Sequence, residues 1–158
     1  ETAPTIERLR LRVEALTGER FNHAVVLIYR DGEDSIGPHK DKLLDLDPTA
    51  PIAAVSLGAP RLLSLRDHIH QPTIEQRVHL RPGSLYMLGP KTNAAFYHAI
   101  PRIGPAGSRV SVTFRRAATF RDAGGRLFGQ GADHQGLNWP EVLRGVHRLD
   151  ADLDQPMG

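Results

Sequence analysis

Short apolar segments separated by turn residues run through most of the chain. Valine, isoleucine and leucine concentrate in these segments, and glycine, proline and aspartate lie between them. Segments of this length and composition are typical of β-strands. The pattern predicts strands near residues 22–30, 38–42, 52–57, 61–66, 75–80, 84–88, 96–101 and 108–116. So many short strands, with one row of polar residues directed inward, predict a mainly β fold with flanking helices (α+β) and a jelly-roll core.

A helical pattern precedes the strands. Apolar residues recur there at helical spacing, at Ile6, Leu9, Val13 and Leu16. Thr5 is expected to cap this helix and Gly18 to end it, and we expect the helix to pack on the outside of the sheet. After the last strand, the glycine-rich residues 117–136 predict a loop or hairpin, and Trp139-Pro140 predicts the start of a short helix.

Length and composition fit one domain. With 158 residues, of which 40% are hydrophobic, the chain can bury a core and leaves no room for a second domain of ordinary size. We therefore expect a single domain over residues 1–158, with its core at about 5–116 and a C-terminal extension at 117–158. Because the first residue is Glu1 rather than methionine, and few residues precede the first strand, we expect an upstream lid to be absent or truncated.

Cysteine content and charge narrow the functional classes. The chain has no cysteine, which excludes disulfides and thiolate metal sites and is compatible with a reducing cytoplasm. We expect a cytoplasmic monomer without membrane contact, because no apolar run approaches the roughly 18 residues of a membrane span. The 20 basic and 18 acidic residues give a net charge of only +2, so charge does not decide whether nucleic acid is a partner.

A histidine and an aspartate with metal-ligand spacing stand in the sequence Gly37-Pro38-His39-Lys40-Asp41. If this segment is a strand, His39 and Asp41 point to the same face, and His98 on a distant strand can complete the set. Lys40 would then point away from the metal, toward solvent. Two imidazoles and one carboxylate leave three coordination positions open, which favours a non-haem Fe(II) oxygenase over a closed structural zinc site.

The last predicted strand carries a row of polar side chains. Positions alternate there, so that the polar residues Arg109, Ser111, Thr113 and Arg115 share one face. Two arginines would be costly to bury without an anion, and guanidinium groups bind carboxylates through paired charge-assisted hydrogen bonds. Together with the metal triad, the row favours a 2-oxoglutarate site.

These segments resemble the core of the AlkB-like Fe(II)/2-oxoglutarate dioxygenases. The resemblance covers about residues 5–116 and rests on segments in the family's order and spacing, at residues 21–32, 34–41, 52–59, 83–88, 96–101 and 109–115. It implies a double-stranded β-helix. It also implies Fe(II), 2-oxoglutarate and O2 as cofactors, and a reaction that hydroxylates the substrate and releases succinate and CO2.

The resemblance assigns roles to individual residues. The implied iron ligands are His39, Asp41 and His98. Arg109 would hold the distal carboxylate of 2-oxoglutarate with help from Tyr29 and Ser111, and Arg115 would lie near the keto-acid end of the cosubstrate. Residues expected to line the substrate pocket are Arg61, Tyr86, Tyr97 and Asp45.

Two departures from the family pattern leave the substrate open. Leu27 stands where the repair enzymes usually carry an asparagine, and Leu43 stands where they place an acidic residue that recognises the damaged base. The first hypothesis is oxidative demethylation of N-alkylated bases in DNA or RNA, as in DNA repair, with the base flipped into the pocket. The second is hydroxylation or demethylation of a small molecule or a protein side chain. The third is a catalytically silent binding module of the same fold, for which Leu27 is the hint.

Overall fold

The structure is a computed structural model that describes residues 3–132. The chain divides into two compact units, Glu1–Ala118 and Thr119–Gly158, which are described separately. The helix predicted from Trp139 lies outside the described residues. No helix in the described range is long and apolar enough to cross a membrane.

The first unit contains the predicted strands. Its elements follow in the order α1 (Pro4–Thr17), β1 (His23–Tyr29), β2 (Ile36–His39), β3 (Ile52–Gly58), β4 (Arg61–Arg66), β5 (Glu75–Leu80), β6 (Leu85–Leu88), α2 (Pro90–Ala95), β7 (Tyr97–Ile100) and β8 (Arg109–Arg115). Each predicted strand is present, with ends that differ by three residues at most. The six-residue helix α2 was not predicted.

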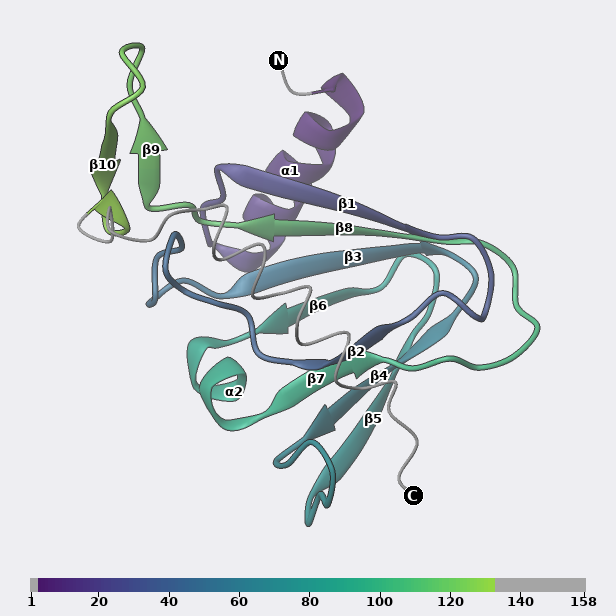
Figure 1. Cartoon of the computed structure of the whole chain (residues 1–158). Coiled ribbons are helices and arrows are strands. Elements are labelled where there is room, and N and C mark those ends of the chain that lie inside the picture. Colours follow the sequence, from purple (N-terminus) through teal and green to yellow (C-terminus); the bar gives the residue numbers. More distant parts are fainter. Residues whose placement is uncertain (1–2, 133–158) are drawn as a thin grey trace. The chain divides into compact units, whose positions relative to one another are not determined.

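The strands form two four-stranded antiparallel sheets. One sheet has the order β1-β8-β3-β6 and the other has the order β2-β7-β4-β5 (Figure 1). Strand β1 pairs with β8, β2 with β7, β3 with β6 and β4 with β5, which is the pairing of one long hairpin rolled up on itself. Rolling adds the contacts of β3 with β8 and of β4 with β7. This arrangement is a jelly roll, and the predicted fold class is confirmed.

Helix α1 covers the outer face of the β1-β8-β3-β6 sheet. Val13, which is 2% exposed, packs there with Phe21 and Phe114, and the partly buried Ile6 and Leu9 join them. The predicted packing on the outside of the sheet is confirmed. Apolar residues of β8 therefore face the helix, and the polar residues of the same strand face the other sheet.

The ends of α1 agree only in part with the prediction. Gly18 ends the helix in a left-handed conformation (φ 74°) and donates its N–H to the Glu14 carbonyl, as expected. The predicted cap at Thr5 is wrong, because the N-cap is Ala3 and Pro4 occupies the first helical turn. Proline suits that place because its φ is already helical and the N–H that it lacks would have no partner there.

The second unit begins with a hairpin. Strand β9 (Thr119–Arg121) pairs with β10 (Leu127–Gly129), and the Phe120 and Phe128 rings lie 5.6 Å apart. The hairpin fulfils the expectation of a loop or hairpin in the glycine-rich residues 117–136, as far as the described range extends.

Candidate active site

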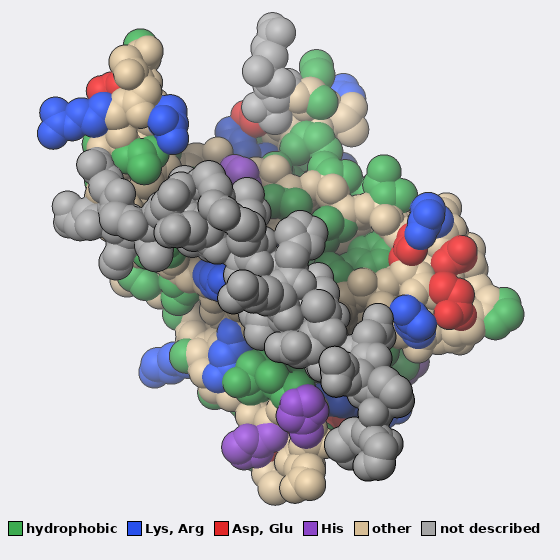
Figure 2. Space-filling model, in the orientation of Figure 1, with side chains coloured by type: hydrophobic (Ala, Val, Ile, Leu, Met, Phe, Trp, Pro, Cys, Tyr) green, Lys and Arg blue, Asp and Glu red, His purple; other side chains and the backbone are tan. Residues whose placement is uncertain are grey.

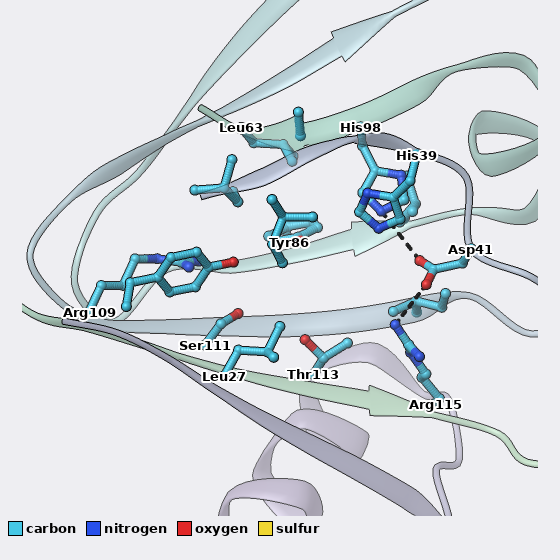
Figure 3. Close-up of a pocket in the computed structure, with 16 residues that line it drawn as sticks. Leu27, His39, Asp41, Leu63, Tyr86, His98, Arg109, Ser111, Thr113 and Arg115 are labelled. Carbon is cyan, nitrogen blue, oxygen red and sulfur yellow. Dashed lines mark hydrogen bonds and ion pairs between the residues drawn. The ribbon is translucent and has the colours of Figure 1, made fainter. Parts of the chain in front are cut away.

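The polar row of β8 lies in a pocket between the two sheets (Figure 3). Arg109, Ser111 and Thr113 are 1%, 4% and 8% exposed, and Arg115 is half-buried at the end of the row. Strand β8 runs between β1 and β3, so its backbone is held on both edges. The predicted inward direction of this row is confirmed.

Two histidines lie side by side on one wall of the pocket. His39 ends β2 and His98 lies directly opposite it on β7, with ring centroids 4.1 Å apart. Nδ1 of His39 lies 2.9 Å from the Gly37 carbonyl. A hydrogen bond from this nitrogen leaves Nε2 as a lone-pair donor for a metal ion.

Asp41 completes a cluster whose ligand atoms all lie within 4.8 Å of one another (Figure 3). Its Oδ2 lies 3.4 Å from Nε2 of His98. The route by which Asp41 reaches the cluster differs from the prediction, because β2 ends at His39 and Asp41 lies beyond the strand. The expectation that a strand over 38–42 aligns both ligands is therefore wrong, although the ligands do come together.

A hydrogen bond from His98 and the charge of Arg115 keep Asp41 ionised. Burial alone would raise the pKa of Asp41, but the hydrogen bond with His98 and the charge of Arg115 outweigh it and lower the pKa below its ordinary value. Nη2 of Arg115 donates to Oδ1 of Asp41 over 2.7 Å. Arg115 therefore lies beside the His39, Asp41 and His98 cluster, where this hydrogen bond holds the Asp41 carboxylate. An anionic carboxylate beside two imidazoles suits a divalent transition metal.

Arg109 lies at the other end of the row and has donors to spare. Its Nη2 donates to Ser56 Oγ over 2.8 Å, and its guanidinium carbon lies 4.9 Å from the Tyr29 ring centroid. Nε and Nη1 are buried without a hydrogen-bond partner among residues 3–132. Unpaired buried N–H groups are costly. The arrangement fits an anionic group that accepts from Arg109, as the distal carboxylate of 2-oxoglutarate would.

The remaining walls of the pocket are aromatic and apolar. Tyr29 from β1 and Tyr86 from β6 both line it, and burial raises the pKa of each phenol, so both hydroxyls stay neutral. Leu27 also lines the pocket from β1, at the position where the family resemblance led us to expect an asparagine. The sequence analysis predicted no role for Ser56, although strand alternation places it on the same face of β3 as the buried Ala54.

Three residues predicted for the substrate pocket do not line it. Arg61 is 2% exposed and its guanidinium donates to the carbonyls of Asp31, Asp34 and Pro101. Arg61 therefore connects these loop carbonyls by hydrogen bonds and is not among the residues that line the pocket.

Tyr97 precedes His98 on β7, and strand alternation turns it to the opposite face, where Lys40 lies 4.7 Å from its ring centroid. Asp45 is held away because its carbonyl accepts from Ala118. Of the four predicted substrate residues, Tyr86 alone lines the pocket.

Comparison with known proteins agrees with this geometry. A family model described as the 2OG-Fe(II) oxygenase superfamily matches residues 1–115. The DNA oxidative demethylase ALKBH2 of Mus musculus is 42% identical over 120 residues, which cover 72% of this chain and 50% of the relative. The human ALKBH2 is 38% identical over 120 residues, which cover 72% of this chain and 46% of the relative.

A second group of relatives is more distant. The alpha-ketoglutarate-dependent dioxygenase alkB homolog 3 of Rattus norvegicus is 30% identical over 122 residues, which cover 71% of this chain and 41% of the relative. The chain thus spans about half the length of the curated relatives it matches. The family implies Fe(II), 2-oxoglutarate and O2 as cofactors. Because the family model matches most of the chain, including the triad and the β8 row, the chain belongs to the 2OG-Fe(II) oxygenase superfamily as an AlkB-like member.

Proposed function

We propose that this chain is an Fe(II)- and 2-oxoglutarate-dependent dioxygenase that oxidatively demethylates N-alkylated bases in DNA or RNA. One observation carries the reaction class: the cluster of His39, Asp41 and His98 shares a pocket with Arg109, a buried arginine that has unused donors. The similarity to ALKBH2 supports the choice of substrate.

The residues of the pocket have different roles in this reaction. His39, Asp41 and His98 would hold the iron, and Arg109 would bind the distal carboxylate of 2-oxoglutarate. The bound iron and cosubstrate supply the oxidising chemistry, in which 2-oxoglutarate and O2 yield succinate, CO2 and one oxygen atom for the substrate. Arg115 keeps Asp41 anionic and oriented. The apolar side chain of Leu63, which is 3% exposed, helps exclude water from the pocket.

An N-methyl substrate would lose its methyl group without a further catalyst. Hydroxylation of the methyl carbon gives a hemiaminal, whose C–N bond breaks to release formaldehyde and the free base. A base must leave its stack to reach a pocket between two sheets, so we expect single-stranded or flipped bases to be used. Tyr86 is the aromatic residue of the pocket wall that we expect to contact the base.

The test is to measure succinate and formaldehyde together. The protein is incubated with Fe(II), 2-oxoglutarate and either an N-methylated oligonucleotide or its unmethylated counterpart. Equal amounts of succinate and formaldehyde, dependent on the methylated base, are the expected result. The absence of 2-oxoglutarate turnover with every substrate would refute the enzyme and favour a binding module.

Two observations favour a second candidate, an oxygenase of a small molecule or a protein side chain. Leu43 stands where the repair enzymes carry an acidic base-recognising residue, and Asp45, the nearest acidic substitute, does not line the pocket. On the part of the face in Figure 2 that grey atoms leave uncovered, lysine and arginine side chains stand in separate places. Turnover of 2-oxoglutarate without formaldehyde from any oligonucleotide would select this candidate. A monomeric state and a cytoplasmic location stay predictions.

A further inference from the structure

Asp41 has no strand partner, although it belongs to the metal cluster. Strand β2 ends at His39, which is paired with His98 on β7. If this register continued, Phe96 would lie opposite Asp41. The N–H of Phe96 instead donates to the Thr92 carbonyl at the end of α2, over 2.8 Å. The backbone of Asp41 therefore needs another donor and another acceptor.

Asn93 supplies both. Its Oδ1 accepts from the N–H of Asp41 over 2.9 Å, and its Nδ2 donates to the Asp41 carbonyl over 3.0 Å. A side-chain amide carries the same donor and acceptor as a peptide group, so Asn93 takes the place of the missing strand. The side chain belongs to α2 and is 3% exposed, which shields both bonds from water.

Lys40 forms another hydrogen bond between α2 and the segment that follows β2. Its Nζ donates to the Ala94 carbonyl in α2 over 2.5 Å. As expected, Lys40 points away from the metal ligands, and its half-buried side chain lies along α2 with Nζ 4.7 Å from the Tyr97 ring centroid. The short helix thus holds the segment that joins the ligands His39 and Asp41.

We propose that Asn93 is a positioning residue for the metal site, which holds the backbone of Asp41 so that its carboxylate stays at the cluster without a strand to support it. This inference rests on the proposed function, since it presumes that the triad binds a metal. Asn93 contacts the backbone of the ligand and leaves both carboxylate oxygens to Arg115, His98 and the ion.

A ligand held in place before binding loses less conformational freedom when the ion arrives. Residues that orient metal ligands from outside the coordination sphere typically change metal affinity by about 10- to 100-fold when they are removed. We expect Asn93→Ala to weaken binding by that factor, even though no ligand atom is deleted.

The chain offers a matched control. Asn22 clamps the backbone of Ala117 in the same way, with Oδ1 accepting from its N–H over 2.7 Å and Nδ2 donating to its carbonyl over 3.0 Å. Asn22 is exposed and does not line the pocket. Asn22→Ala therefore removes the same pair of hydrogen bonds without touching the segment that carries the metal ligands.

The experiment measures the affinity of the whole chain for Mn(II), which replaces Fe(II) without turnover, by calorimetric titration under argon. The parent and Asn22→Ala should bind alike, and Asn93→Ala should bind about 10- to 100-fold more weakly. Asn93→Ser, whose hydroxyl can restore one of the two bonds, should lie between them and serves as the test if the alanine variant does not fold. In the metal-free protein, hydrogen exchange at the Asp41 amide should become faster in the Asn93 variants and unchanged in Asn22→Ala.

The outcomes separate the inference from the function beneath it. A parent protein that binds no Mn(II) refutes the metal site, and the inference with it. A parent that binds Mn(II), together with folded Asn93 variants that bind within about threefold of it, overturns the inference and leaves the proposed function standing.

Discussion

Arg109→Met should abolish tight binding of 2-oxoglutarate without destabilising the metal-free, cosubstrate-free protein. Arg109 is 1% exposed, and its described hydrogen bond is the one to Ser56. Its Nε and Nη1 have no partner among the described residues, so the protein without cosubstrate bears the cost of an incompletely paired buried cation. Methionine is of similar length and has no polar hydrogen to satisfy.

The substitution should weaken cosubstrate binding strongly and change the stability of the free protein little. Removing one partner of a buried charge pair costs roughly 2 to 5 kcal/mol, which corresponds to a dissociation constant raised about 30-fold to several thousand-fold. In the free protein, loss of the Ser56 hydrogen bond costs about 1 kcal/mol, and relief of the two unpaired N–H groups offsets it. We therefore expect the free energy of unfolding without cosubstrate to stay within about 1 kcal/mol of the parent's, or to rise.

Two measurements check these values. Calorimetric titration of the Mn(II)-loaded protein with 2-oxoglutarate gives the dissociation constant, and thermal melting with and without 2-oxoglutarate gives the stabilisation. At a concentration of about 100 dissociation constants, the cosubstrate should add about 2.7 kcal/mol to the parent and almost nothing to the variant at the same concentration. If Arg109→Met binds 2-oxoglutarate within about threefold of the parent, another residue anchors the distal carboxylate and the assignment is wrong.

Three further predictions follow from other residues. Asp41→Ala should remove the anionic ligand of the triad and abolish Mn(II) binding, as measured by electron paramagnetic resonance, and undiminished binding would exclude Asp41 as a ligand. Arg61→Met should lower the free energy of unfolding in urea by roughly 2 to 5 kcal/mol, because it leaves three backbone carbonyls without their charged donor; equal stability would contradict this role. The hydrogen bond from the Phe21 N–H, together with Arg20 and Arg10, lowers the pKa of Glu14 below its ordinary value of 4.5. In acid-unfolding curves, the stability that the parent has over Glu14→Gln should therefore be complete above pH 4.5 and decline as the pH falls below it. A stability difference independent of pH would refute the ionised carboxylate.

The sequence predicts the strands well because their pattern is local. Strand β8 shows this best, since alternation alone separates Arg109 and Ser111 from Val110 and Val112, and the two sets do face opposite sides of the sheet. The histidine ligands are likewise recognisable from their spacing and from the family resemblance.

What the sequence does not predict depends on contacts between distant segments. Helix α2 has six residues, too few for a helical period to show, and its stability comes from its surroundings. Beyond the end of β2, the backbone of Asp41 bonds to the amide of Asn93, which no local pattern connects with the metal ligand. The sequence analysis assigned Arg61 to the substrate pocket and did not reveal its structural role, because the carbonyls that accept its hydrogen bonds come from two other loops.

The pairing of β1 with β8 has a consequence for synthesis and folding. Within the jelly roll, β1 is the first strand to be synthesised, and β8, the strand that pairs with it, is the last. Until then, the run Val25-Val26-Leu27-Ile28 has no neighbour to cover its backbone or side chains. The nascent jelly roll therefore carries an unpaired, aggregation-prone strand until β8 has been made, and folding that relies on such distant pairings is slow. Chaperone demand during production should be set by this one strand, and charged substitutions at its exposed Val26 and Ile28 should raise soluble yield.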